Sequence, residues 1–269
     1  MGRVTVYRYD DLVDLYRSMP IPAGTTISIK TDLLALGRFE VPRKQAILQA
    51  HLDAIDKVFS LEKSTLVVAT STTHLCETDT PYDHDQSTSN VGVFTEFVRN
   101  QPGALRSFHA FESYAALGSA PESICSDTSP VSYGCESPEE RLVQAGAWCI
   151  VIGANPIRCC STIHYLEQVV GVPYRYIREY DHPVIREGER FVGRFYRNPW
   201  YRKADVQKDT SRFFEQTYKR GFEIHRYPLG SGAICAYSLR DLYQCGVSVL
   251  HTDPYLCLSH TPTIQPWRQ

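Results

Sequence analysis

Residues 159–168 read CCSTIHYLEQ, and this segment places a histidine and a glutamate one helical turn apart. Positions three residues apart are neighbours on the surface of a helix, so His164 and Glu167 would meet on one face. A neutral imidazole can take a proton from a reacting group, and a carboxylate beside it can orient the ring and stabilise its charged form. The pair predicts general-base catalysis by His164 with help from Glu167, and a solvated helix face is the alternative.

The surroundings of His164 favour the catalytic interpretation. The apolar residues 148–152 predict a buried strand, and a helix is expected to run from a cap at Ser161 or Thr162 to a stop at Gly171. In open α/β folds, ligands bind beyond the carboxyl ends of the strands, where the next helix begins. A helix N-terminus also disfavours the imidazolium ion, so His164 is expected to be neutral near pH 7.

Strands and helices alternate through the first two thirds of the sequence. Apolar runs predict strands, and apolar residues at helical spacing, a Ser-Pro-Glu-Glu start at residue 137 and Pro-Gly stops predict helices. The expected strands are 25–29, 64–70 and 148–152, and the expected helices are 43–59, 92–100, 137–147 and 162–170. Residues 71–90 read as a polar loop, and residues 232–239 and 247–250 as strand-like or helical. This alternation predicts an α/β fold, with a sheet covered by helices.

Composition excludes several classes of protein. Hydrophobic residues make up 43% and charged residues 22% of the 269 residues, which is typical of a globular chain. The net charge of −2 does not suggest nucleic-acid binding, and no apolar run is long enough to cross a membrane. The first residues have no secretory leader and the nine cysteines form no C-x-x-C pair, which predicts reduced thiols in a cytoplasmic protein.

Cys159 and Cys160 form a vicinal pair beside the helix of His164. Such a pair can act as a nucleophile or a redox couple, or it can simply pack at the end of a strand. No cluster of basic residues that would lower a thiol pKa lies beside the pair in the sequence. The sequence therefore favours two packed thiols.

Residues 87–118, STSNVGVFTEFVRNQPGALRSFHAFESYAALG, resemble the signature of the aminoglycoside 3-N-acetyltransferase family (the antibiotic N-acetyltransferases). The matching positions are Gly92, Phe97, Arg99, Pro102, Gly103, Ala104, Arg106, Ser107, His109, Ser113, Ala116 and Gly118. The resemblance continues at Tyr133-Gly134 and Ser137-Pro138. It ends with a T-x-x-H-Y-x-E segment at Thr162, His164, Tyr165 and Glu167.

The resemblance implies a fold and a reaction. The expected fold is an α/β/α sandwich in one domain over residues 1–269, with an excursion rich in arginine and aromatic residues at about 174–212. The expected reaction moves an acetyl or related acyl group from acetyl-CoA, as co-substrate and without a metal, to an amine by direct attack in a ternary complex. His164 falls on the catalytic histidine of the family.

The resemblance also assigns residues to the acyl donor. The expected CoA-binding residues are Lys30, Thr31, Asp32, Leu33, Arg106, Ser107 and Ser113. Three polar residues of the family's loop after the first strand differ here, and Lys30 suits a pyrophosphate better than Asp32 does. Arg106 has two interpretations, a contact to a CoA phosphate or an anchor for its own loop.

The acceptor is left open between two chemical classes. The residues assigned to it are His109, Glu112, Asp79 and Asp83. A carboxylate-rich loop could attract a polycationic aminoglycoside or could simply be solvated. The arginine-rich segment would repel such a cation and suits an anionic amine, such as a nucleotide-linked amino sugar or a phosphonate, unless its charges are paired.

A function without catalysis is the remaining alternative. The altered donor loop allows a protein that binds CoA or a sugar ligand without transfer, although the retained His164 and Glu167 argue against this. In either case the expected partner is a small amine, with no nucleic acid and no membrane. The resemblance is compatible with a homodimer.

Overall fold

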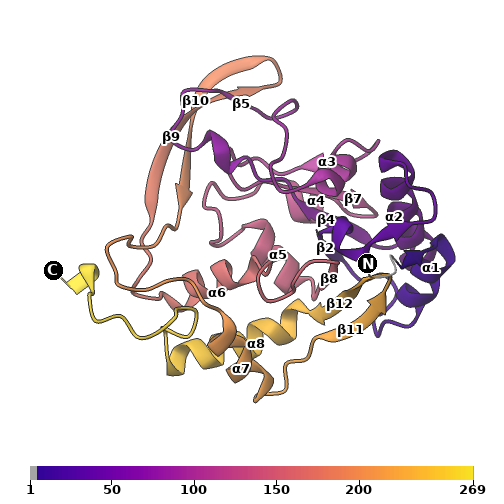
Figure 1. Ribbon diagram of the computed structural model, residues 1–269. Coiled ribbons are helices and arrows are strands. Elements are labelled where there is room, and N and C mark those ends of the chain that lie inside the picture. The colour runs from indigo at the N-terminus through magenta and orange to yellow at the C-terminus, as the bar shows by residue number, and fades with distance from the viewer. Residues whose placement is uncertain (1–4, 269) are drawn as a thin grey trace.

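A mixed seven-stranded sheet forms the centre of the molecule (Figure 1). The computed structural model describes residues 5–268. The strands lie in the order β11-β12-β8-β2-β4-β7-β6. Their bounds are β11 His225–Leu229, β12 Gly232–Ser238, β8 Trp148–Ile152, β2 Ile27–Thr31, β4 Thr65–Ala69, β7 Tyr114–Gly118 and β6 Leu105–Arg106. A two-stranded pair, β1 Val6–Tyr7 and β3 Arg38–Phe39, lies apart from this sheet.

Strands β4, β2 and β8 are parallel. Strands β7 and β12 pair antiparallel to β4 and β8, and β6 and β11 pair antiparallel to β7 and β12 in turn. Ile27 in β2 is opposite both Leu66 in β4 and Trp148 in β8. The carboxyl ends of these three strands therefore meet at one edge of the sheet, which is where open α/β folds bind ligands.

Helices cover both faces of the sheet. Side chains alternate between the faces of a strand, and β4 shows this clearly, because Val68 joins one buried cluster and Val67 the other. One face packs against α1 Tyr9–Arg17, α2 Lys44–Phe59 and α3 Val93–Arg99. The other packs against α4 Glu122–Cys125, α5 Pro138–Gln144, α6 Thr162–Val170, α7 Ser211–Tyr218 and α8 Leu239–Thr252. The predicted α/β/α sandwich is confirmed.

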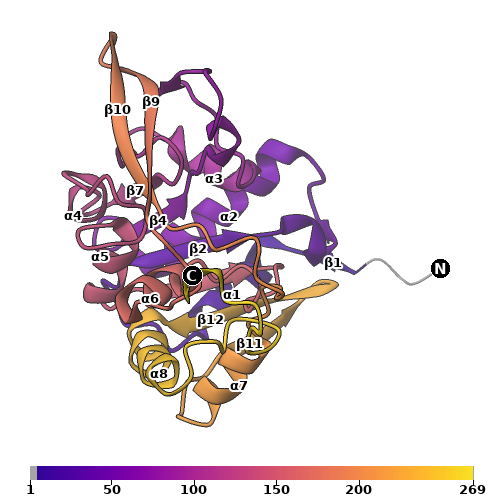
Figure 2. The ribbon, with the colours of Figure 1, turned by 90° about the vertical axis from the view of Figure 1, so that its left-hand side faces the viewer.

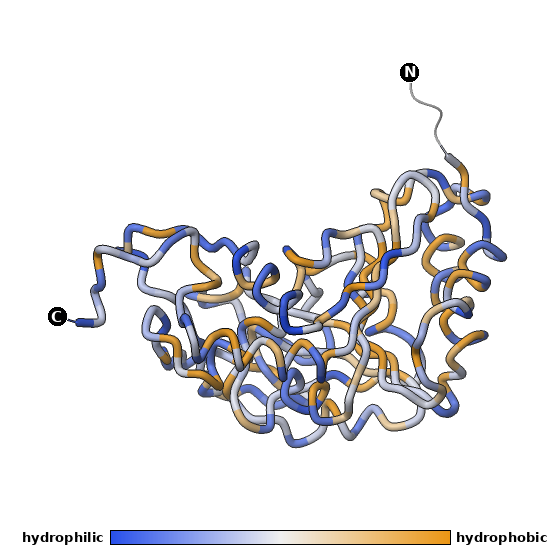
Figure 3. The backbone as a smooth tube through the Cα atoms, turned by 90° about the horizontal axis from the view of Figure 1, so that it is seen from below, coloured by the Kyte–Doolittle hydropathy of each residue, from blue (hydrophilic) through white to orange (hydrophobic). Residues whose placement is uncertain are grey.

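The helices are amphipathic, as this layered arrangement requires. Hydrophilic and hydrophobic residues alternate along their turns in Figure 3. The expected helices 43–59, 92–100 and 162–170 are observed within one or two residues, and Gly171 ends α6 in the left-handed conformation, with φ of 71°. The apolar residues 247–250 lie inside α8. No helix within residues 5–268 is long and apolar enough to span a bilayer.

The predicted cap of α6 is correct in position, because Ser161 is the N-cap residue, but the capping hydrogen bond is absent. Neither Ser161 nor Thr162 caps α6 through its side chain. Both hydroxyl groups instead donate to the buried carboxylate of Glu139 on α5. By contrast, Ser137 caps α5 as expected, because its Oγ accepts a hydrogen bond of 3.3 Å from the backbone nitrogen of Glu140.

A β-hairpin projects from the sandwich (Figure 2). It consists of β9 Arg178–Arg186 and β10 Glu189–Arg197, and β9 also pairs with the short β5 Tyr82–Asp83. Its two-residue loop, Glu187 and Gly188, has φ of 53° and 82°, as a type I′ turn requires. The hairpin lies within residues 174–212, for which the sequence predicted an excursion but no strands.

Two glycines with positive φ provide a test of backbone packing. A Cβ on Gly153 would lie 2.1 Å from the carbonyl oxygen of Asp32, whereas one on Gly171 would meet nothing within 4 Å. We expect Gly171→Ala to lose about 1–2 kcal/mol from left-handed strain alone. Gly153→Ala should lose at least about 3 kcal/mol because the clash with backbone adds to that strain. Urea unfolding measures both, and equal losses would contradict the role of close backbone approach.

Candidate active site

His164 lies beyond the carboxyl edge of the parallel strands. It belongs to the first turn of α6, which follows β8. The end of β2 contacts the same helix start, because Nζ of Lys30 donates a 2.8 Å hydrogen bond to Oγ of Ser161. The position predicted for His164 is therefore observed.

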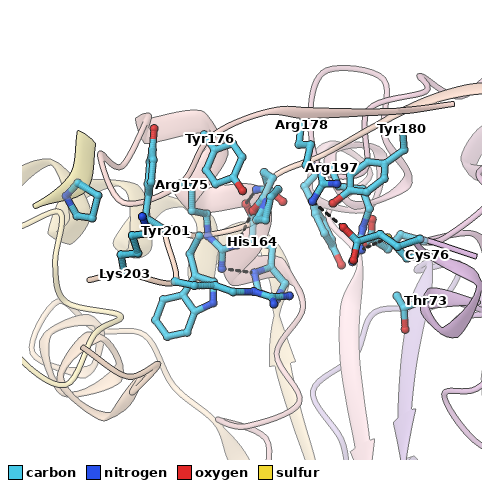
Figure 4. A pocket seen from close by; sticks show the side chains of 18 residues that line it. Thr73, Cys76, His164, Arg175, Tyr176, Arg178, Tyr180, Arg197, Tyr201 and Lys203 are labelled. Carbon is cyan, nitrogen blue, oxygen red and sulfur yellow. Dashed lines mark hydrogen bonds and ion pairs between the residues drawn. The ribbon is translucent and has the colours of Figure 1, made fainter. Parts of the chain in front are cut away.

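Charged groups surround the imidazole of His164 on two sides, and Figure 4 shows the contact with Arg175. Its Nδ1 lies 3.3 Å from Oε2 of Glu167 and 2.9 Å from Nη2 of Arg175. Its Nε2 lies 3.4 Å from Nζ of Lys208. The guanidinium group of Arg175 can only donate hydrogen bonds. Nδ1 of His164 therefore accepts from Arg175 when Nδ1 is unprotonated, and donates to Glu167 when Nδ1 carries the proton.

Glu167 is an ionised carboxylate in the interior, with 1% of its surface exposed. Its Oε2 accepts from Nε of Arg175 at 2.7 Å, and its Oε1 accepts from the hydroxyl group of Tyr174 at 2.7 Å. Burial opposes its charge, but hydrogen bonds from His164 and Tyr174 and the charge of Arg175 prevail and lower its pKa to about 2. Glu167 therefore does not belong to a solvated helix face.

His164 is held in its neutral form. Burial is the main cause that lowers its pKa, and the positive charges of Lys208 and Arg175 lower it further, against the opposing effect of Glu167. The sequence predicted the same direction from the helix N-terminus, whereas burial is the largest cause. A neutral imidazole near pH 7 can accept a proton.

A cavity of about 900 Å³ opens beside His164. The strands β9 and β10, the segment that follows β10, and the loop before α3 contribute most of its wall. Its lining residues are Thr73, Cys76, Glu77, Glu112, Tyr133, His164, Arg175, Tyr176, Arg178, Tyr180, Arg197, Asn198, Pro199, Trp200, Tyr201, Arg202, Lys203 and Pro266. This volume is in the range that holds a small-molecule substrate.

Of the residues assigned to the acceptor, Glu112 lines the cavity and His109 lies behind it. Glu112 accepts from Nη2 of Arg197 at 2.7 Å. Nδ1 of His109 accepts from the backbone nitrogens of Phe111 and Glu112, both at 3.1 Å, which leaves Nε2–H to point at Ser132 at 3.2 Å. Burial lowers the pKa of His109 to about 4, so this ring is also neutral.

Asp79 and Asp83, the other acceptor residues, do not line the cavity. They belong to the loop that contains β5, beside the hairpin. Oδ1 of Asp83 accepts from the backbone nitrogens of Asp85 and Gln86, so it closes its own turn. The structure therefore separates these two carboxylates from His164.

The residues assigned to CoA fall into two groups, and neither lines the cavity. Lys30, Thr31, Asp32 and Leu33 lie at and just beyond the carboxyl end of β2. Ser107 and Ser113 are fully buried. Arg106 donates to the carbonyl oxygens of Thr70, His84 and Ser87 and to Oγ of Ser113, which are the contacts expected of a loop anchor.

Several residues of the site were not found by sequence reasoning. Tyr133, whose ring centre lies 5.1 Å from that of His164, appeared only as part of the resemblance. Arg175 was one of many arginines in the excursion, and its place directly after the stop of α6 was the available signal. Glu139 was read as a helix-start residue, but it is 1% exposed and accepts from the hydroxyl groups of Tyr114 and Thr162 at 2.5 and 3.1 Å.

The vicinal cysteines are packed thiols, as the sequence favoured. Cys160 is buried, and burial raises its pKa. Burial likewise raises the pKa of Cys159 to about 11. Neither thiol ionises readily at neutral pH, so neither is suited to act as a nucleophile.

Comparisons with known proteins agree on one family. Residues 29–251 match the sequence profile described as aminoglycoside 3-N-acetyltransferase. A 108-residue segment is 34% identical to aminoglycoside N(3)-acetyltransferase VII of Streptomyces paromomycinus, and covers 40% of this chain and 37% of that relative. A 145-residue segment is 28% identical to aminoglycoside N(3)-acetyltransferase IX of Micromonospora chalcea, over 53% and 48% of the two chains. The chain thus spans less than half the length of these relatives.

The fold of the chain is also shared with a solved structure. The crystal structure of aminoglycoside acetyltransferase AAC(3)-Xa superposes with a TM-score of 0.78. The match covers 91% of this chain and 93% of the other, at 20% sequence identity. At this identity the likeness establishes the fold alone.

The charge of Lys208 can be tested through the pKa of His164. We expect Lys208→Gln to raise that pKa, because the removed ammonium group disfavours the imidazolium ion. Titration of the His164 ring by NMR measures the shift directly, without a substrate. Lys219→Gln, which removes an exposed charge on the C-terminal side of α7, is the control and should leave the titration unchanged. A lower pKa in Lys208→Gln would refute the described electrostatics.

Proposed function

Since the chain belongs to the aminoglycoside 3-N-acetyltransferase family, we propose that it transfers an acetyl group from acetyl-CoA to an amine held in the cavity beside His164. One observation carries this proposal. A neutral histidine forms part of the wall of a substrate-sized cavity, and a buried carboxylate stands behind its ring. Proton removal from an amine needs such a base.

The proposed reaction is direct transfer in a ternary complex. An ammonium group has no free electron pair, so it must first lose one proton to solvent. The neutral amine then attacks the thioester carbonyl carbon, and His164 takes the second proton from the nitrogen. The N–C bond forms and the C–S bond breaks, and CoA leaves as a thiolate that receives the proton from His164. No enzyme nucleophile is needed, in keeping with the raised pKa values of Cys159 and Cys160.

Glu167 and Arg175 are proposed to set the tautomer of the His164 imidazole and to stabilise its position. When Nδ1–H donates to Glu167, Nε2 has a free electron pair for the incoming proton. The resulting imidazolium ion is then stabilised by the carboxylate. Arg175 also holds the carbonyl oxygen of Asn198 at 2.7 Å, so it ties α6 to the segment after β10 that forms the cavity wall.

The donor and acceptor sites follow from the family as proposals. The names of the relatives give an aminoglycoside as their acceptor, and that class is the first to test here. Lys30, Thr31, Asp32 and Leu33 are proposed to contact CoA at the end of β2, beside the start of α6. We place the reaction in the cytoplasm, where acetyl-CoA is available and the nine free cysteines stay reduced.

Loss of the base should abolish most of the transfer. We expect His164→Ala to lower kcat by about 10²–10⁴-fold, the usual contribution of a general base, and to leave CoA binding unchanged. Mass spectrometry of acetylated product, with pools of aminoglycosides and amino sugars, measures the rate, and calorimetry measures CoA binding. His251→Ala, at an exposed site on α8, is the matched control. Near-normal turnover by His164→Ala would overturn the assignment of the base.

The pH profile should respond to the carboxylate. Glu167 raises the pKa of His164, so Glu167→Gln should lower that pKa. Because the base must be neutral to accept a proton, the acid limb of the kcat/KM profile should move to lower pH. On the plateau of the profile kcat should fall, because the imidazolium ion loses the carboxylate that stabilises it. The titration of the acceptor amine is common to both enzymes and cancels in the comparison. A limb that moves to higher pH would contradict the proposed role of Glu167.

A further inference from the structure

The cavity beside His164 has more positive than negative side chains. Its lining cations are Arg175, Arg178, Arg197, Arg202 and Lys203, and its lining carboxylates are Glu77 and Glu112. Five cationic and two anionic groups leave an excess of three positive charges. The buried Glu167 reduces this excess by one, and Lys208 at Nε2 of His164 restores it.

Both carboxylates of the cavity wall are already paired with an arginine. Glu77 pairs with Arg178 at 2.7 Å. Glu112 pairs with Arg197 at 2.7 Å and also accepts from the hydroxyl group of Ser132. A polycationic acceptor would have to compete with these arginines for the carboxylates and would also meet the remaining positive charge.

Two of the cations are free to bind a ligand. Arg175 is held by Glu167 and the carbonyl oxygen of Asn198, and Arg197 by Glu112. Arg202 and Lys203 are exposed in the segment after β10, and within residues 5–268 neither forms an ion pair. Both side chains lie on the same wall as the aromatic rings of Trp200 and Tyr201.

The geometry points to a phosphate-bearing amine as the acceptor, bound through Arg202 and Lys203 with its amino group toward His164. This inference rests on the proposed acetyl transfer. The arginine fork and the lysine ammonium group both donate strongly to phosphate oxygens, and a cavity of about 900 Å³ has room for a sugar phosphate or a nucleotide-linked sugar.

The phosphates of CoA are the competing ligand for these two cations. The residues proposed for the donor, Lys30, Thr31, Asp32 and Leu33, do not line the cavity. If the donor binds there, saturating CoA leaves Arg202 and Lys203 open to the acceptor. If CoA binds to Arg202 and Lys203 instead, saturating CoA excludes a second phosphate ligand.

Calorimetry with saturating CoA separates these cases. The probes are glucosamine 6-phosphate and glucosamine, which share one amine and differ by the phosphate, with UDP-glucosamine and kanamycin as further arms. We expect glucosamine 6-phosphate to bind at least about tenfold more tightly than glucosamine, the effect of one good charge-assisted hydrogen bond. Tighter binding of UDP-glucosamine would identify a nucleotide-linked source of the phosphate.

A double variant tests the two residues. Arg202→Gln with Lys203→Gln should remove most of the advantage of glucosamine 6-phosphate and leave glucosamine and CoA binding unchanged. Arg190→Gln with Lys63→Gln removes the same charge at exposed positions outside the cavity and should leave all affinities unchanged. Thermal unfolding confirms that both variants fold.

Three results would overturn the inference. They are equal binding of glucosamine and its phosphate, tighter binding of kanamycin, and weaker CoA binding in the Arg202–Lys203 double variant. The acetylation assay decides the proposed function separately. Acetylation of kanamycin but not of glucosamine 6-phosphate would support acetyl transfer and contradict the phosphate-bearing acceptor. Phosphate-dependent binding without any acetylated product would contradict acetyl transfer.

Discussion

The ionised carboxylate of Glu167, buried at 1% exposure, is the constraint on which the site depends. An unpaired charge in the interior is very costly, so a fold that retains it must surround it with donors. Arg175, Tyr174 and His164 supply those donors, and all three come from α6 or the residues just after it. The need to satisfy one carboxylate therefore fixes the path of the chain beyond α6 and the orientation of the imidazole ring.

A second buried carboxylate holds the other side of the same helix start. Glu139 accepts hydroxyl groups from Tyr114 on β7 and Thr162 on α6, and Ser161 joins it to Lys30 at the end of β2. This network connects two strands of the sheet and α5 to the turn that carries His164. On such a rigid support, the proposed base His164 would need little reorganisation to accept a proton.

The sequence predicted the sheet covered by helices and the position of His164 because both leave local signals. The period of apolar residues identified α2 and the strand ending at Ile152, and the strand-to-helix position identified His164. The hairpin β9–β10 was missed because its outer residues, such as Val192 and Arg194, show no strict alternation of polar and apolar types. The burial of Glu167 and Glu139 could not be predicted either, because the partners of a buried charge come from distant segments that only tertiary packing brings together.

The proposed base and most of the cavity wall belong to different parts of this chain. The proposed base, His164, lies on a helix packed into the core, while nine of the eighteen residues of the cavity wall come from the hairpin and from residues 198–203 after it. Substitutions in an exposed segment are tolerated far better than substitutions in a packed core. If His164 is the base, such a division would let acceptor preference diverge during evolution while the proton-transfer residues stay intact, so related chains with the same helix would be able to serve acceptors of opposite charge.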